Sequence, residues 1–205
     1  MNKAAEQVIG IYQRHFEAFD RHRGRSLFER GWLDRLLASM DRPGDLLDFG
    51  CGMGEPIARY LIDRAHRVTG VDTSAGMLAL CRERFPDHDW LEADMRVLDL
   101  QKQFDGLIAF NSFFHLTRDD QRAMFRIFGR HAAPGAPLLF TSGPDEGEIL
   151  GEMKGEPLFH ASLSPEEYRS LLDANGFDTL EFVAEDPDCN GHCVWLAKRR
   201  YDRGR

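Results

Sequence analysis

The chain has 205 residues, 42% of them hydrophobic and 29% charged, and this composition fits one globular domain with one buried core over residues 1–205. Its formal net charge of −8 creates no basic field that would attract nucleic acid or an anionic membrane surface, so neither is an expected partner. Because no stretch reaches the roughly 18 apolar residues of a membrane span and the N-terminus lacks an apolar signal core, we expect a cytoplasmic protein.

The first part of the chain predicts an N-terminal helical cap over residues 1–40, ahead of a Rossmann-like core over residues 41–200. Apolar residues recur at helical spacing in two runs, and Gly24 separates them. Two helices are therefore expected before the first strand.

The core predicts alternating strands and helices. Strands are expected at 45–49, 67–71, 90–93, 104–110 and 137–142, with helices at 56–64, 74–85 and 118–131. Residues 143–162 predict a loop, and Ser164 begins the last helix as its cap. Residues 177–184 and 193–197 then predict an antiparallel hairpin. The pattern indicates an α/β fold with a doubly wound, mostly parallel seven-stranded sheet, helices on both faces and a C-terminal antiparallel hairpin.

The four cysteines do not indicate a metal site. None of them forms a Cys-x-x-Cys pair. We interpret the segment from Cys189 to Cys193 as a hairpin turn around Asn190-Gly191, because no second pair of ligands lies nearby. No metal cofactor is expected.

The segment after the first predicted strand is rich in glycine and reads Asp48-Phe49-Gly50-Cys51-Gly52-Met53-Gly54-Glu55. Three alternating glycines allow a tight turn and the close approach of a ligand to the backbone. The second strand ends at Asp72, 18 residues after Gly54, which is close to the spacing at which an acid accepts hydrogen bonds from ribose hydroxyls. Together the two features indicate an adenosine-type ligand.

The same segment argues against a dinucleotide. Glu55 or Ile57 stands where the pattern Gly-x-Gly-x-x-Gly requires its third glycine. A carboxylate at Glu55 would repel a pyrophosphate at a helix N-terminus, whereas a ligand with an ammonium and a sulfonium tolerates Asp48 and Glu55 nearby. A cationic nucleoside is favoured, and a nicotinamide-dependent oxidoreductase remains an alternative hypothesis.

In this order the motifs resemble those of the class I (Rossmann-like) S-adenosylmethionine-dependent methyltransferases of the small-molecule type. The resemblance extends over roughly residues 30–198, and its central motifs are the glycine loop, Asp72, Asp94-Met95 and the strand from Phe104 to Ala109 followed by Asn111. It implies S-adenosylmethionine as cofactor, S-adenosylhomocysteine as product, and methyl transfer to an oxygen or nitrogen of a small molecule.

Two further hypotheses remain beside this one. A non-catalytic S-adenosylmethionine-binding module would keep the pocket without turnover. A nucleic-acid methyltransferase would need a basic face, and the segment Asn111-Ser112-Phe113-Phe114 lacks the prolines of the motif that grips a flipped base. The sequence does not indicate the oligomeric state or the methyl acceptor.

The resemblance also implies which residues bind the cofactor. Gly50 to Gly54 would line its methionine part, Asp72 would hold the ribose diol, Asp94 would accept from the adenine amine and Met95 would pack on the ring. The full expected set is Asp48, Gly50, Cys51, Gly52, Gly54, Asp72, Thr73, Met77, Asp94, Met95 and Asn111.

Two histidines are the candidate catalytic residues. Methyl transfer from a sulfonium chiefly requires alignment and the exclusion of water, but a neutral imidazole at His115 or His160 would help to take a proton from the acceptor. The structural alternatives are a partly buried histidine at a helix start for His115 and a surface-loop histidine for His160. Because N-terminal helices often cover the cofactor in methyltransferases of this build, Tyr12 and Trp32 are expected to line the substrate site together with His160.

Overall fold

The computed structural model describes residues 3–201 and contains the alternating helices and strands that the sequence predicts. The helices are α1 (Lys3–His22), α2 (Arg30–Ala38), α3 (Ile57–Ile62), α4 (Ala75–Arg84), α5 (Arg118–His131) and α6 (Pro165–Ala174). The strands of the main sheet are β1 (Asp45–Phe49), β2 (Arg67–Asp72), β3 (Asp89–Glu92), β4 (Gly106–Ala109), β5 (Pro137–Ser142), β8 (Phe177–Asp186) and β9 (His192–Arg199). Short 3-10 turns are η1 (Met95–Val97), η2 (Phe113–His115) and η3 (Pro187–Cys189).

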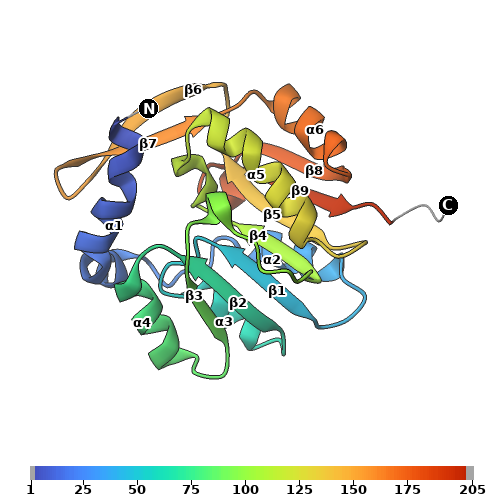
Figure 1. Ribbon diagram of the computed structural model, residues 1–205, viewed down its shortest axis with the longest axis horizontal. Helices are drawn as coiled ribbons and strands as arrows, with labels where there is room; N and C mark the ends of the chain where they lie inside the picture. The colour runs from blue at the N-terminus through green and yellow to red at the C-terminus, as the bar shows by residue number, and fades with distance from the viewer. Residues whose placement is uncertain (1–2, 202–205) are drawn as a thin grey trace.

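The main sheet has seven strands in the order β3-β2-β1-β4-β5-β9-β8 (Figure 1). The first five pair in parallel, and β9 pairs in antiparallel fashion with both β5 and β8. The β8–β9 turn contains Asn190 and Gly191, both with positive φ. This confirms the predicted doubly wound sheet with its C-terminal antiparallel hairpin.

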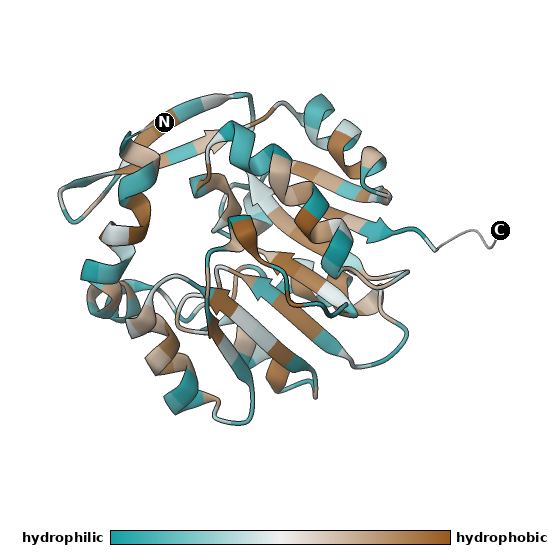
Figure 2. Ribbon diagram, in the orientation of Figure 1, coloured by the Kyte–Doolittle hydropathy of each residue, from teal (hydrophilic) through white to brown (hydrophobic). Residues whose placement is uncertain are grey.

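Helices cover both faces of the sheet because successive side chains of a strand point to opposite faces. On β1, Leu47 and Phe49 pack in one fully buried cluster with residues of α5 and α6. Leu46, the residue before Leu47, points to the opposite face and packs in a second cluster with residues of α2, α3 and α4. Figure 2 shows the resulting concentration of hydrophobic residues in the central strands. The helix α2 therefore belongs to a layer on the sheet, whereas α1 lies apart from it.

Three helices begin with the side-chain caps that their sequences suggest. Ser74 accepts a hydrogen bond from the Met77 amide, Thr117 from the Asp120 amide and Ser164 from the Glu167 amide. Such a cap stabilises a helix by about 1 kcal/mol. Two of these starts, at Ser74 and Thr117, lie beside the carboxyl ends of β2 and β4, where they help to shape the pocket described below.

The prediction of a loop over residues 143–162 is wrong. Gly147–Met153 (β6) and Glu156–Ser162 (β7) pair as an antiparallel hairpin outside the main sheet. Leu158, Phe159 and Ala161 of β7 pack against Val8 and Ile11 of α1, and Figure 1 shows the hairpin alongside that helix. The residues of α1 that bury β7 are thus some 150 positions away in the chain. Because β6 is largely exposed, its sequence does not show the alternation of apolar and polar residues that predicts a strand.

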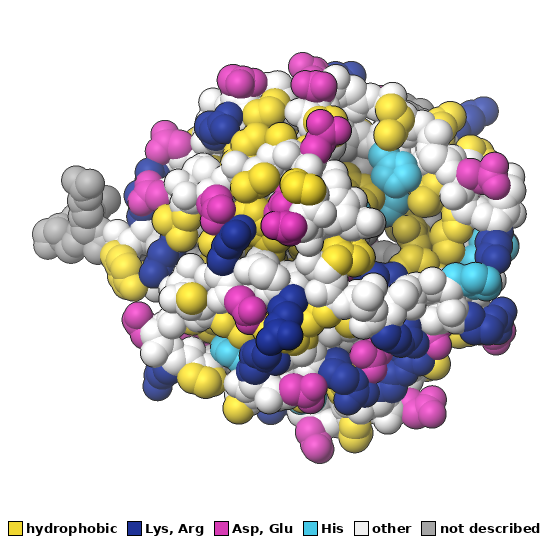
Figure 3. Space-filling model, turned by 180° about the vertical axis from the view of Figure 1, so that it is seen from behind, with side chains coloured by type: hydrophobic (Ala, Val, Ile, Leu, Met, Phe, Trp, Pro, Cys, Tyr) yellow, Lys and Arg dark blue, Asp and Glu magenta, His cyan; other side chains and the backbone are white. Residues whose placement is uncertain are grey.

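The surface carries a mixture of charges. Seen from behind, acidic and basic side chains are interspersed over the molecule (Figure 3). Among residues 3–201, no helix is both long and apolar enough to cross a membrane.

Candidate functional site

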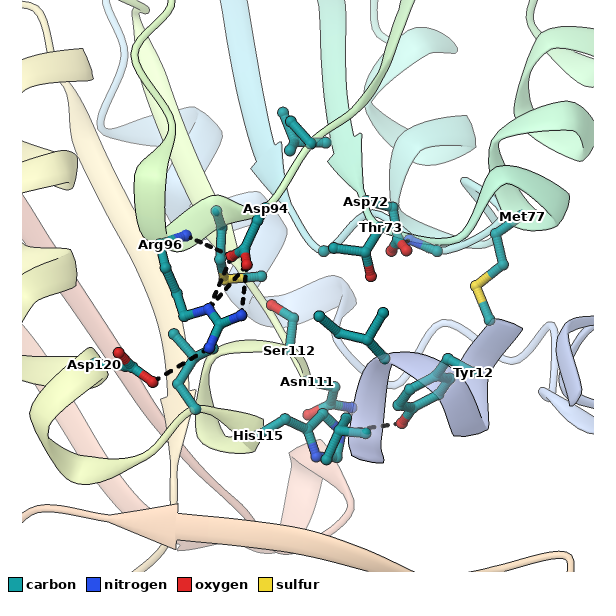
Figure 4. A pocket seen from close by; sticks show the side chains of 18 of the residues that line it. Tyr12, Asp72, Thr73, Met77, Asp94, Arg96, Asn111, Ser112, His115 and Asp120 are labelled. Atoms are coloured by element: carbon teal, nitrogen blue, oxygen red, sulfur yellow. Dashed lines mark hydrogen bonds and ion pairs between the residues drawn. The ribbon is translucent and has the colours of Figure 1, made fainter. Parts of the chain in front are cut away.

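A pocket lies at the carboxyl ends of the parallel strands, with α1 as its cover (Figure 4). The empty space of the pocket, counted together with the open solvent at its mouth, is about 870 Å³. Ligands of doubly wound sheets bind at this edge. The lining residues include Ala5, Val8, Ile9, Tyr12 and Phe19 of α1 and, from the strand ends and following turns, Gly50, Gly52, Asp72, Thr73, Met77, Asp94, Met95, Arg96, Asn111, Ser112, His115, Leu116, Thr117 and Asp120.

The loop after β1 needs its glycines for two reasons. Gly50 and Gly52 have φ values of +76° and +55°, a region that disfavours residues with a Cβ. A Cβ on Gly50 would also lie 2.3 Å from the Cβ of Ser112. The backbone of this loop therefore forms one wall of the pocket without side chains from these two positions.

Asp72 ends β2 with its carboxylate held by backbone amides. Oδ2 accepts a hydrogen bond from the Gly52 amide and Oδ1 from the Ser74 amide, each at 2.9 Å. Burial raises the pKa of Asp72, and these backbone hydrogen bonds oppose the increase. Because each oxygen can accept a further hydrogen bond, the oriented carboxylate suits a pair of hydroxyl donors such as a ribose diol.

Asp48 is buried beside the same loop but does not line the pocket. Its burial, with a smaller contribution from the negative charge of Asp72, raises the pKa of Asp48 to about 7. A cation bound in the pocket would favour the ionised form of both carboxylates.

The raised pKa of Asp48 predicts a pH-dependent effect of the substitution Asp48→Asn on the ligand-free protein. An acid whose pKa is raised by folding stabilises the protein at low pH and loses that contribution between its unfolded value, about 4, and its folded value. The melting temperature of Asp48→Asn relative to wild type should therefore rise by several degrees between about pH 4 and pH 7. Thermal unfolding across this range measures it. Both proteins share the same histidines, so a constant difference would contradict the raised pKa.

Tyr12 of α1 and His115 of η2 form a hydrogen-bonded pair on the pocket wall. Tyr12 Oη lies 2.9 Å from His115 Nε2, and His115 Nδ1 lies 2.9 Å from the carbonyl oxygen of Phe159. A carbonyl only accepts, so Nδ1 carries the proton and Nε2 accepts from the Tyr12 hydroxyl. Burial lowers the pKa of His115 to about 4, and burial followed by the charge of Asp72 raises the pKa of Tyr12 to about 12. Both side chains are therefore neutral near pH 7.

Most of the expected site residues meet at this pocket, and several do not. Asp48, Cys51 and Gly54 lie outside the pocket lining. His160 is on β7 with its ring centroid 4.7 Å from that of His115, but it does not line the pocket. Trp32 is 2% exposed and packs in the core, where its Nε1 donates to Asp186 Oδ2 at 2.7 Å. The structure thus gives Trp32 a packing position away from the pocket.

The site also contains residues that sequence reasoning missed. Arg96, Thr117 and Asp120 line one end of the pocket beside Asp94. Arg96 directly follows the motif Asp94-Met95, and this position next to two expected site residues is the sequence feature that indicates its place in the pocket. Asp120 lies in the first turn of α5, and only the packing of α5 beside η1 brings it to Arg96.

Comparison with known proteins points to methyl transfer. Residues 46–135 match the model of a family described as a methyltransferase domain. The chain is 31% identical over 197 residues to dTDP-4-amino-2,3,4,6-tetradeoxy-D-glucose N,N-dimethyltransferase of Saccharopolyspora spinosa. This alignment covers 83% of this chain and 79% of that protein. It is 47% identical over 108 residues to a trans-aconitate 2-methyltransferase of Rhodopseudomonas palustris, covering 52% of this chain but only 41% of that protein's length.

A solved structure shares the fold. CalS10, an amino pentose methyltransferase from Micromonospora echinaspora determined with bound S-adenosylmethionine, superposes with a TM-score of 0.72 at 24% identity. The match covers 90% of this chain and 96% of that one.

Proposed function

This chain belongs to the class I S-adenosylmethionine-dependent methyltransferases, and we propose that it methylates an amino nitrogen of a small molecule, with an amino sugar as the acceptor class. The observation that carries the choice of nitrogen is the neutral Tyr12–His115 pair in a pocket whose other ionisable residues are mainly acids.

Three features support a proposed position for the cofactor. The glycine loop leaves room for the methionine part, Asp72 offers two oriented oxygens to the ribose, and Asp94 and Met95 lie at the end expected for adenine. The acids of the pocket also match the positive charge of a sulfonium. When bound, the cofactor supplies an electrophilic methyl group, so the protein must chiefly orient the acceptor and exclude water.

The Tyr12–His115 pair suits an amine acceptor. Because the Tyr12 hydroxyl donates to His115 Nε2, the lone pairs of Oη remain free to accept an N–H of the acceptor. That contact orients the lone pair of the amine nitrogen toward the methyl group. Forming the new C–N bond would break the C–S bond of the sulfonium, whose electron pair stays on sulfur, and the surplus proton on nitrogen would leave to solvent. Tyr12, oriented by His115, would hold the nitrogen during this step.

The charges of the pocket argue against a carboxylate acceptor. Of the described residues that line the pocket, Arg96 alone carries a permanent positive charge, and Asp94 and Asp120 already pair with it. A carboxylate would be buried without a cationic partner, which is costly. The apolar side chains of Ala5, Val8 and Ile9 instead suit a deoxygenated sugar, as in the substrate named for the Saccharopolyspora relative.

The proposal predicts the outcome of an acceptor comparison. Transfer of a radiolabelled methyl group from S-adenosylmethionine would be measured with three acceptors: dTDP-4-amino-2,3,4,6-tetradeoxy-D-glucose, its 4-hydroxy analogue and trans-aconitate. We expect turnover with the amino sugar and none with trans-aconitate, because only the amine matches the neutral pair and the acidic lining. Turnover with trans-aconitate or with the hydroxy sugar alone would overturn the assignment to nitrogen. Cofactor binding without turnover on any amine would instead favour a non-catalytic binding module.

A further inference from the structure

Arg96 holds the Asp94 carboxylate in a fixed orientation at one end of the pocket. Its backbone amide donates to Asp94 Oδ1 at 2.9 Å, and its Nε lies 3.0 Å from both Oδ1 and Oδ2. Its Nη2 donates to Oδ2 at 2.6 Å. The side chain and the backbone amide of Arg96, a residue of η1, thus both donate hydrogen bonds to the Asp94 carboxylate.

The other edge of the same guanidinium faces α5. Nη1 lies 3.6 Å from Asp120 Oδ2, and Figure 4 shows Arg96 between the two carboxylates. Asp120 is itself fixed, because its Oδ2 accepts from the Thr117 hydroxyl at 2.9 Å while its amide donates back to that hydroxyl at 3.2 Å. This reciprocal cap anchors Asp120 to the start of the helix. Arg96 therefore ties Asp94 to a rigid element.

The grip of Arg96 limits what else Asp94 can bind. A carboxylate has about four acceptor positions, and three donor groups of Arg96 occupy three of them: the backbone amide binds Oδ1, Nη2 binds Oδ2, and Nε is shared between the two oxygens. Partial burial opposes ionisation of Asp94, but the hydrogen bonds and charge of Arg96 outweigh it and lower the pKa of that carboxyl. Asp94 therefore stays anionic and offers one remaining position, which suits a single N–H donor.

We propose that Arg96 is a positioning residue that sets the preference of this pocket for adenine over other purines. Because Arg96 pairs with Asp94 on one edge and with Asp120 on the other, it directs the last free acceptor position of Asp94 toward the exocyclic amine of the base. A purine with a carbonyl at that place would bring one acceptor against another. The inference rests on the proposed cofactor site.

Without Arg96 the two carboxylates lose their shared partner. Asp94 could then rotate, and its negative charge would face that of Asp120 without a cation between them. The pocket would still contain Asp72 and the glycine loop, so binding of the ribose and methionine parts would persist. What should be lost selectively is the discrimination between purine bases.

The test compares two ligands that differ only at the base. S-adenosylhomocysteine and S-inosylhomocysteine would be titrated calorimetrically into wild type, Arg96→Met and Arg118→Met. Arg118 is a matched control, because its side chain is 38% exposed against 37% for Arg96 and it also pairs with two carboxylates, Glu146 and Glu148. Arg118 lies in the first turn of α5, as Asp120 does, but it does not line the pocket. Arg96→Lys serves as a second variant, since it keeps a charge between the acids but loses the planar fork.

Wild type should prefer S-adenosylhomocysteine by about 10- to 100-fold, the range for a hydrogen bond to a charged group. Arg96→Met should reduce that ratio to less than about threefold, Arg96→Lys should reduce it in part, and Arg118→Met should retain it. An unchanged ratio in folded Arg96→Met or Arg96→Lys would overturn the inference, as would a wild type that does not distinguish the bases. If wild type bound neither ligand, the proposed cofactor site would be overturned instead. If wild type bound S-adenosylhomocysteine but showed no methyl transfer to an amine acceptor, the proposed function alone would be overturned.

Discussion

Replacement of His115 by phenylalanine should lower kcat by about 10²- to 10³-fold, while the affinity for S-adenosylhomocysteine changes little. The substitution keeps an aromatic ring but removes the acceptor Nε2 and the Nδ1–H group that donates to Phe159. The Tyr12 hydroxyl then loses its orientation, and the amine loses the contact that directs its lone pair. Steady-state kinetics with the acceptor that supports turnover measures the effect.

The neighbouring histidine provides the control for this prediction. His160→Phe removes an imidazole whose ring lies beside that of His115 but outside the pocket, so its kcat should stay within about tenfold of wild type. Because burial lowers the pKa of His115 to about 4, charging of His115 should add no fall in kcat near pH 6.5 to the fall caused by protonation of the acceptor amine. A near-normal kcat for His115→Phe, or a larger loss for His160→Phe, would transfer the proposed role from His115 to another group.

The second large effect is expected at Asp72. The substitution Asp72→Ala should weaken the binding of S-adenosylmethionine and S-adenosylhomocysteine by about 1–3 kcal/mol, or about 5- to 150-fold, because charge-assisted hydrogen bonds to the ribose are lost. The amides of Gly52 and Ser74 also lose their acceptor, so the glycine loop is less well held. Calorimetric titration with both ligands measures the loss.

Glu92, a carboxylate on the neighbouring strand β3, provides the control for Asp72→Ala. Glu92 pairs with Asp72 in the register of β2 and β3 but is exposed and does not line the pocket. Glu92→Ala should bind both ligands as wild type does. If Asp72→Ala also kept its affinity, the ribose would have to bind elsewhere, and the proposed orientation of the cofactor would be wrong.

The elements whose signals are local agree with the structure. The strand at 45–49 and the helix at 118–131 have the bounds that their periodicity predicts, and Ser164 caps the last helix. The glycine loop is also local, since positive φ at Gly50 and Gly52 is a requirement of those residues' own backbone. For such features, the information that determines the conformation lies within a few residues of the position concerned.

The sequence by itself therefore determined the sheet, the glycine loop and Asp72 at the end of the second strand, because alternation, glycine content and strand ends are properties of short segments. Tertiary structure decided which side chains meet at the pocket. Tyr12 and His115 are 103 positions apart, and Trp32, expected beside them, instead binds Asp186 at a separation of 154. The strand β7 becomes buried only against α1, and Arg96 gains its second carboxylate only because α5 packs beside η1. Contacts between distant segments depend on how helices pack onto the sheet, and no local pattern in the chain specifies that packing.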